Sequence, residues 1–147
     1  NPTHYLQIDG HDFGETDFLR ELVNRTGCAL LLDLNNVWIS ANNLQTDAMA
    51  YLRDYPLASV AEIHLAGFTA DPILGDALLI DSHDQPVSGS VWQLYRHVIA
   101  QIGPVPTLIE RDGNLPSFDE LLLERDAAND VLVARVEATN TQEVVTC

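Results

Sequence analysis

The side chains best suited to chemistry stand close together in residues 78–84, which read LLIDSHD. A short apolar run is followed at once by two carboxylates and an imidazole, those of Asp81, Asp84 and His83. In an extended chain alternate side chains share a face, so Asp81 and His83 are predicted to point the same way. Such a pair can hold a metal ion or form a buried ion pair. The segment alone leaves both possibilities open.

The elements that must position these residues follow an alternating pattern. Apolar runs that predict strands lie at residues 28–36, 60–67 and 105–112, and the first is continuous enough to favour burial on both faces. Helical spacing is found at residues 15–25, 46–54 and 90–102, and a capping box at 117–120 opens a further helix. Residues 68–77 predict a loose segment, and those after about 129 give mixed signals. The pattern predicts one α/β domain over residues 1–147, with parallel strands alternating with helices.

The composition limits the classes of partner. Seven basic residues against 22 acidic ones give a formal charge of −15, which disfavours binding to nucleic acid or to anionic membranes. No stretch approaches the roughly 20 apolar residues of a membrane span, and no signal peptide is visible. Cys28 and Cys147 have no metal or redox spacing. Because Cys28 lies in an apolar run, we expect a buried thiol, which is consistent with a reducing compartment and a cytoplasmic location.

Three further polar residues stand at the ends of the expected strands. Asp33, His64 and Glu110 each occupy the last turn of a different strand, where α/β proteins bind their ligands. Asn36 falls where the chain leaves the first strand. Together with the pair at 81 and 83, these oxygens and nitrogens predict a metal cage, and its histidines suit iron, manganese or zinc better than calcium.

Each of these residues also has an ordinary structural interpretation. Asp33 could cap the turn that follows it, and His64 could be a core histidine that pairs with Glu62. Glu110 could pair with Arg111 or cap a loop. The remaining histidines are expected to have no functional role, namely His4, His11 and His97.

Several blocks of the sequence are similar to one known family. The segments LLLDLNNVWISANN, EIHLAG, LLIDSHD and GPVPTLIERD resemble the methanobactin-biosynthesis (MbnB-like) family of multinuclear non-haem iron-dependent oxidative enzymes. The resemblance extends from Asn1 to about Leu123. It implies a TIM (β/α)8 barrel of the xylose-isomerase-like superfamily, with two or three iron ions in the C-terminal mouth of the barrel.

The resemblance also implies roles for individual residues. Asp33, His64 and Glu110 would be iron ligands, and Asp81 with His83 would bind a neighbouring iron. Asn36 stands where the related endonuclease IV enzymes carry a histidine ligand, so its role is less defined. Asp84 or Asp112 would orient a histidine from behind.

The resemblance places this chain in the C-terminal half of the barrel. A bridging glutamate would lie immediately before Asn1, and two further histidine ligands would belong to the N-terminal half. We expect such a half-barrel to associate with itself through its open face, or to be a proteolytic remnant, and to lack full activity on its own.

The activity implied is the oxidation of a cysteine in a ribosomally made precursor peptide, using O₂ and a small partner protein that presents the peptide. One alternative is phosphodiester hydrolysis or sugar isomerisation on zinc or manganese, as in relatives within the superfamily. The charge of −15 and the asparagine at position 36 argue against the DNA-cleaving form of this alternative. Another alternative is an inactive fragment that binds no metal.

Overall fold

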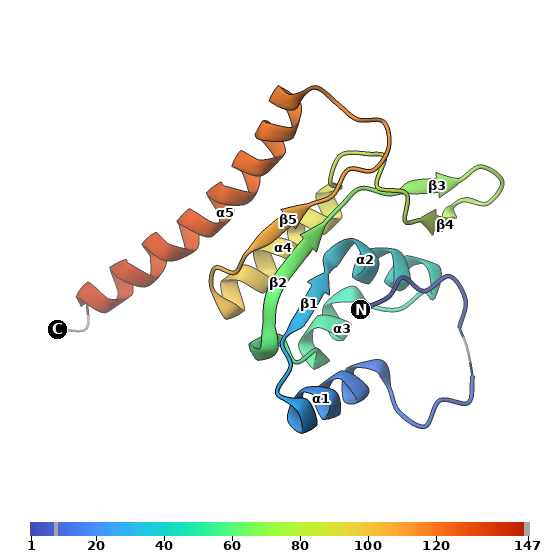
Figure 1. Cartoon of the computed structure of the whole chain (residues 1–147), viewed down its shortest axis with the longest axis horizontal. Helices are drawn as coiled ribbons and strands as arrows, with labels where there is room; N and C mark the ends of the chain where they lie inside the picture. Colours follow the sequence, from blue (N-terminus) through green and yellow to red (C-terminus); the bar gives the residue numbers. More distant parts are fainter. Residues whose placement is uncertain (8, 146–147) are drawn as a thin grey trace.

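The structure, a computed structural model, describes the backbone of residues 1–7 and 9–145 and the side chains of residues 1–7 and 9–136. Figure 1 shows the elements in chain order. They are α1 (Glu15–Thr26), β1 (Leu30–Asp33), α2 (Leu34–Asn43), α3 (Ala48–Asp54), a short 3-10 turn (Leu57–Ser59), β2 (Val60–Leu65), β3 (Thr69–Asp71), β4 (Gly75–Ile80), α4 (Gly89–Ile102), β5 (Thr107–Ile109) and α5 (Phe118–Val145).

The central feature is a three-stranded parallel sheet in the order β1-β2-β5. Its register sets Asp33 beside His64, and Leu65 beside Ile109. Helices separate the strands along the chain, which confirms the predicted α/β alternation. In the part of the chain that the structure describes, this sheet does not close into a barrel.

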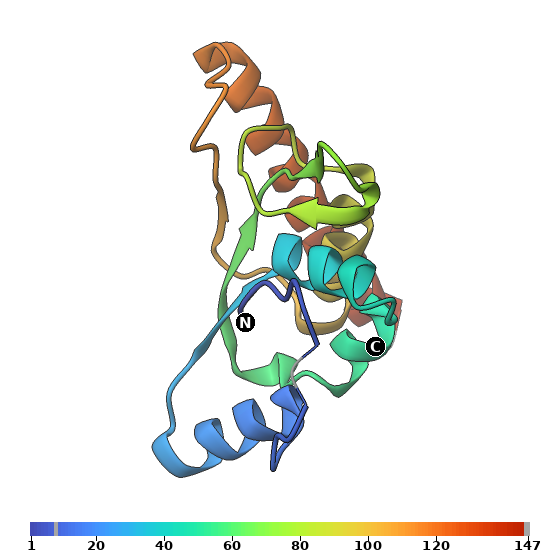
Figure 2. The same cartoon turned by 90° about the vertical axis from the view of Figure 1, so that its right-hand side faces the viewer.

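The sheet is covered on one side. Figure 2 shows α2, α3 and α4 on the same side of the three strands. The residues that face these helices, such as Leu32 and Ile63, are fully buried, whereas Leu31 and Leu108 are 40% and 46% exposed. The expectation that the first strand is buried on both faces is therefore wrong for this structure, because no helix of residues 9–145 covers its second face.

The helix α2 begins directly after Asp33 and was not expected. The carboxylate of Asp33 accepts a hydrogen bond from the backbone N–H of Asn36 at 2.8 Å, so this residue ends the strand and caps the helix at once. The apolar residues of α2, among them Val37 and Ala41, pack into the core. The long apolar run of residues 28–36 thus contains both a strand end and a helix start.

Residues 69–80, most of which were expected to be loose, form the antiparallel hairpin of β3 and β4. Its turn is held by Asp71, whose carboxylate accepts hydrogen bonds from the backbone N–H groups of Ile73 and Leu74 at 2.8 Å. Gly75 then adopts a φ of 58°, a value that glycine tolerates better than other residues. The short strand β3 and the nearby Pro72 hid this hairpin from pattern analysis.

Two further expectations, the capping box at residues 117–120 and the buried thiol of Cys28, have opposite outcomes. The capping box is confirmed, because the side chain of Glu120 accepts from the backbone N–H of Ser117 at 2.9 Å and α5 follows. Cys28, in contrast, is exposed, because it lies in the link between α1 and β1 and outside the sheet. Cys147 lies outside the described residues. No helix in the described part of the chain is long and apolar enough to cross a membrane.

Candidate metal centre

Three side chains meet at the carboxyl edge of the parallel sheet. Asp33 ends β1, His64 is the second-last residue of β2, and Glu110 follows β5. Each offers one ligand atom, and these atoms all lie within 4.8 Å of one another. We call these three residues the cage. The structure thus brings together the set that the strand ends predicted, and its binding of a metal stays a prediction.

Asp33 is the most buried member of the cage, with 6% of its surface exposed. Burial is the main cause that raises the pKa of its carboxyl group, and the nearby carboxylates of Asp81 and Glu110 act in the same direction. The N–H of Asn36 and the ring of His64 lower the pKa, but they do not offset these effects. A cation bound between the carboxylates would remove this repulsion.

His64 stands between two carboxylates. Its Nδ1 lies 3.2 Å from Glu110 Oε1, and its Nε2 lies 3.3 Å from Glu62 Oε1. The pairing with Glu62 that the ordinary interpretation expected is therefore present, together with the contact inside the cage. One ring nitrogen faces the cage and the other has a carboxylate that can fix the tautomer, which is a common arrangement of metal-binding histidines.

Glu110 is held at the edge of the sheet by its backbone, whose N–H donates to Leu65 O at 2.9 Å. Arg111 forms its ion pair with Glu124 of α5, at 2.8 Å, and not with the Glu110 carboxylate. The other carboxylate oxygen of Glu124 accepts the N–H of Val87. The carboxylate of Glu110 is left to the two histidines, His64 and His83.

The pair of Asp81 and His83 forms a second group, which we call the arm. His83 Nε2 lies 2.9 Å from Asp81 Oδ1, and His83 Nδ1 lies 3.4 Å from Glu110 Oε2. The arm therefore adjoins the cage. The two side chains meet as predicted, but not by extended geometry, because His83 adopts a φ of 51°. Its backbone is fixed on both sides, as its N–H donates to Gly67 O at 3.1 Å and its carbonyl accepts from Asp112 N at 2.9 Å.

The imidazole of His83 is surrounded by negative charge. Burial lowers its pKa, but the carboxylates of Asp81, Glu110 and Asp112 outweigh burial and raise the pKa above its ordinary value. Its Nδ1 is buried and makes no hydrogen bond, although Asp112 Oδ2 lies 3.2 Å away. A buried ring nitrogen without a hydrogen bond is a natural position for a metal ligand. Asp112 contacts this same ring nitrogen, whereas Asp84 accepts a hydrogen bond from Ser82, so a role of either in orienting the ring stays a prediction.

Asn36 lies beside both groups. Its side-chain nitrogen donates to Asn1 O at 3.0 Å, and its side-chain oxygen accepts the hydroxyl of Thr3. The same hydroxyl is 2.9 Å from Asp81 Oδ2. Asn36 thus contacts the segment that also holds the arm, and its own role as a ligand stays a prediction.

Sequence patterns missed three residues that hold the arm. The fully buried Asn35 donates to Asp81 Oδ1 at 2.8 Å. Thr3 reaches the other carboxylate oxygen, and the hydroxyl of Tyr5 accepts the backbone N–H of Asp81 at 3.1 Å. For these three residues, the only indication in the sequence was that Asn35 stands two residues after Asp33 and so near the predicted metal cage. Nothing in the first residues of the chain indicated that they lie against residues far along it.

Comparison with known proteins gives one family. Residues 1–133 match the family model described as RiPP precursor modification enzyme MbnB/TglH/ChrH. A UPF0276 protein of Caulobacter sp. (strain K31) is 54% identical over 132 residues, which cover 90% of this chain and 48% of that protein. A UPF0276 protein of Rhizobium meliloti (strain 1021) is 49% identical over 146 residues, covering 99% of this chain and 47% of that protein.

The chain thus spans about half the length of the curated relatives it matches. The match includes the three strands of the parallel sheet and every residue of the cage and the arm. The resemblance seen in the sequence blocks is confirmed: this chain belongs to the MbnB/TglH/ChrH family of RiPP precursor modification enzymes.

Proposed function

We propose that this chain supplies part of the metal centre of an iron-dependent enzyme that oxidises a cysteine of a ribosomally made precursor peptide. The observation that carries the proposal is the convergence of Asp33, His64 and Glu110, whose ligand atoms lie within 4.8 Å of one another. Family membership supports a peptide substrate. A small partner protein that presents the peptide is part of the same proposal.

The donor set fits a transition metal. Two carboxylates and one imidazole at the cage, with a further carboxylate and imidazole at the arm, are the ligand types that iron, manganese and zinc accept. The Nδ1 atom of His83, buried and without a hydrogen bond, faces the same region as Glu110. Asn36 would add an amide oxygen or position Thr3. When bound, iron would supply the redox chemistry that O₂ needs to oxidise a thiol.

The residues of this chain have distinct tasks in that proposal. Asp33, His64 and Glu110 would hold the first ion, and Asp81 with His83 would hold a second one beside it. Glu62 contacts the ring nitrogen of His64 that does not face Glu110, and it would keep that ring oriented. Asp112 contacts Nδ1 of His83, the same nitrogen that faces Glu110. The carboxylate of Glu110 faces both rings, so it is the residue best placed to contact both ions.

We also propose that the chain is the C-terminal half of a TIM barrel. The three parallel strands, their helices on one side and the exposed Leu31 and Leu108 on the other support this assignment. In a barrel the second face would line the interior, and the missing strands would close it. A half-barrel alone would bury this face against another copy. An exposed free thiol at Cys28 is consistent with the cytoplasmic location that we propose.

Elemental analysis of the full-length gene product, purified without oxygen, tests the function. The proposal predicts bound iron and O₂ consumption that depends on a cysteine-bearing peptide. Bound zinc or manganese with no O₂ consumption would favour hydrolysis or isomerisation, and the absence of any metal would favour an inactive fragment. A His64→Ala variant is the control, because it should lose the iron of the cage and the O₂ consumption.

A further inference from the structure

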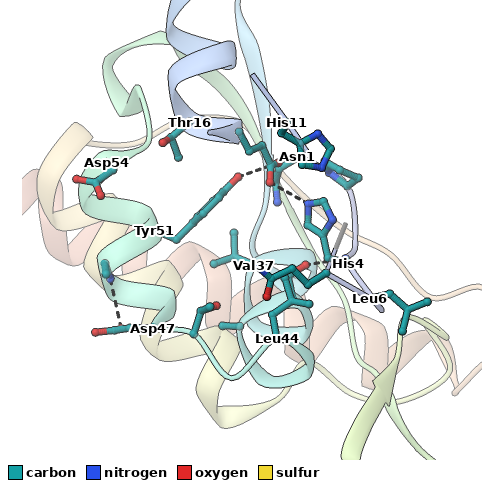
Figure 3. A pocket seen from close by; sticks show the side chains of 17 residues that line it. Asn1, His4, Leu6, His11, Thr16, Val37, Leu44, Asp47, Tyr51 and Asp54 are labelled. Carbon is teal, nitrogen blue, oxygen red and sulfur yellow. Dashed lines mark hydrogen bonds and ion pairs between the residues drawn. The ribbon is translucent and has the colours of Figure 1, made fainter. Parts of the chain in front are cut away.

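A cavity of about 530 Å³ lies apart from the cage, between residues 1–7 and the helices α1, α2 and α3. Its walls are largely apolar, with Val37 and Ala41 from α2, Leu44 directly after that helix and Ala50 from α3. Figure 3 shows Val37 and Leu44 between the labelled polar side chains of the cavity. A cavity of this volume and character is typical of a site that takes an apolar group together with a few polar ones.

One end of the cavity carries a fixed negative charge. Glu15 Oε2 lies 2.9 Å from His4 Nε2, and Glu15 Oε1 accepts the hydroxyl of Tyr51 at 3.1 Å. Tyr51 and His4 point toward the same place in Figure 3. Burial, with the charge of Glu15, raises the pKa of Tyr51, so its hydroxyl stays a neutral donor. The carboxylate is therefore positioned without a permanent positive charge beside it.

The charged residues at the cavity wall have one sign. Glu15, Asp47 and Asp54 line it, and no arginine or lysine is among the lining residues that the structure describes. Asp47 is engaged as the cap of α3, and Asp54 is exposed and lies 3.9 Å from Arg53. Glu15 is more buried and has one partner at each oxygen, and a carboxylate oxygen can accept a second hydrogen bond from a ligand. The chain as a whole is also strongly acidic, with a charge of −15. These charges favour a cationic ligand and disfavour an anionic one.

The cavity is linked to the metal centre by the first five residues. Asn1 and His4 line the cavity, while Thr3 and Tyr5 between and beside them contact Asp81. Asn1 also exchanges two hydrogen bonds of 3.0 Å with the backbone of Asp33. A ligand in the cavity would thus touch the same segment that holds the arm.

We propose that this cavity anchors the precursor peptide, by taking an apolar side chain of the peptide next to an arginine or lysine that pairs with Glu15. The proposal rests on the proposed function, because it assumes a peptide substrate. It assigns a binding role to His4, which was expected to have none, and places His11 in the cavity wall. An anchored peptide would place its following residues across the segment 1–5, toward the cage.

Peptide binding can be measured without the metal. The probe is a fluorescein-labelled acetyl-Leu-Phe-Arg amide, added to the full-length gene product after treatment with a chelator and followed by fluorescence polarisation. Matched probes replace the arginine by glutamate, or the two apolar residues by serine. The arginine probe should bind about tenfold more tightly than either, since a charge-assisted hydrogen bond is worth about 1.5–3 kcal/mol.

Two variants locate the binding. Glu15→Gln keeps the shape of the side chain and should weaken the arginine probe about tenfold, because it removes the charged partner of the arginine. It should not weaken the glutamate probe, which makes no favourable contact with the carboxylate. Ala50→Phe fills the cavity and should abolish binding of all probes. Glu21→Gln is the control, because Glu21 lies on the exposed side of α1, where it pairs with Arg25. It should leave all affinities unchanged.

The outcomes separate this proposal from the proposed function. Equal binding of the arginine and glutamate probes, or no effect of Glu15→Gln, would overturn the anchoring site even if the protein holds iron and consumes O₂. Specific binding by a protein that holds no iron would support the site and count against the oxidative function. If no probe binds and Ala50→Phe lowers the melting temperature, another part of the full-length protein fills the cavity and the proposal is wrong.

Discussion

The cage and the arm carry similar chemistry, but the fold positions them by different means. Asp33 and His64 are direct neighbours in the register of a parallel sheet, and Glu110 follows the pair of Leu65 and Ile109 in the same sheet. Asp81 and His83 lie in a loop after β4, outside any strand. Backbone hydrogen bonds of the sheet thus fix the cage, whereas contacts from several distant segments fix the arm.

This difference predicts a difference in robustness. The strands of the cage are anchored by fully buried residues such as Leu32 and Ile63, so their ends move only if the core moves. The arm depends on single hydrogen bonds that Asn35 and Thr3 donate to Asp81, on one that Tyr5 accepts from it, and on the backbone bond between His83 and Gly67. Removing one support should loosen the arm and leave the cage in place.

The largest effect is expected from removing the histidine of each group. His64→Ala takes away the only imidazole of the cage and should lower the affinity of the cage for its ion by more than about 100-fold. His83→Ala should remove only the metal beside the arm, because the three ligands of the cage remain. Metal content per chain of the two variants, measured by elemental analysis, tests this. Complete loss of metal in His83→Ala would show that the two groups form a single site.

A methyl group at Gly67 should separate the loop of the arm from the sheet. A Cβ atom there would collide with the backbone of Gln85 and Pro86, which cannot yield as a flexible side chain can. We expect Gly67→Ala to lower the free energy of unfolding by about 1–3 kcal/mol, the usual range for overpacking. Chemical denaturation measures it, and Gly89→Ala is the control because a Cβ at Gly89 meets no atom within 4 Å. Equal stability of the two variants would contradict the tight contact.

Asn35 offers a finer test of the arm. Asn35→Ala removes the donor to Asp81 and should lower the free energy of unfolding by about 1–3 kcal/mol, because it leaves the half-buried carboxylate of Asp81 with one partner fewer. The metal beside the arm should bind more weakly, while the metal in the cage should not change. Asn42→Ala removes a similar bond to the backbone of Asp76 from the exposed side of the same helix and serves as the control. A titration with Mn²⁺ followed by electron paramagnetic resonance separates the two classes of ion, and weakening of both would argue against separate supports.

The smallest effect concerns the hairpin that leads into the arm. The N–H groups of Leu74 and Ile73 lower the pKa of Asp71 below its ordinary value of 3.8. A lowered pKa in the folded state means that the ionised carboxylate stabilises the turn above pH 3.8, and that this contribution is lost as the pH falls through the lowered value. Amide chemical shifts of Ile73 and Leu74 should therefore change together below about pH 4, and Asp71→Asn should remove this transition. A transition that persists in Asp71→Asn would assign it to another group.

The cage was predictable from the sequence for the same reason that it is robust. Apolar runs that end in Asp33, His64 and Glu110 reveal both the strands and the residues at their carboxyl ends. Parallel strands bring those ends to one edge whatever the details of the loops. The register of β1 and β2 then determines only how closely Asp33 and His64 approach each other.

The supports of the arm were not predictable by the same argument. Tyr5 and Asp81 are 76 residues apart, and no local pattern connects two segments that meet only in the folded chain. The helix α2 was hidden by a residue with two tasks, because Asp33 both ends a strand and caps a helix. Asp81 and His83 were correctly paired, but the positive φ of His83 replaced the extended geometry that suggested the pairing.

The most direct test of the account is the position of the metal itself. Crystals of the full-length gene product, prepared without oxygen, would give an anomalous difference map at the iron absorption edge. If the cage holds iron, a peak is expected about 2.0–2.2 Å from one atom each of Asp33, His64 and Glu110, the usual length of metal bonds to nitrogen and oxygen. A strong iron peak elsewhere, with the three side chains still in contact only with one another, would contradict the account.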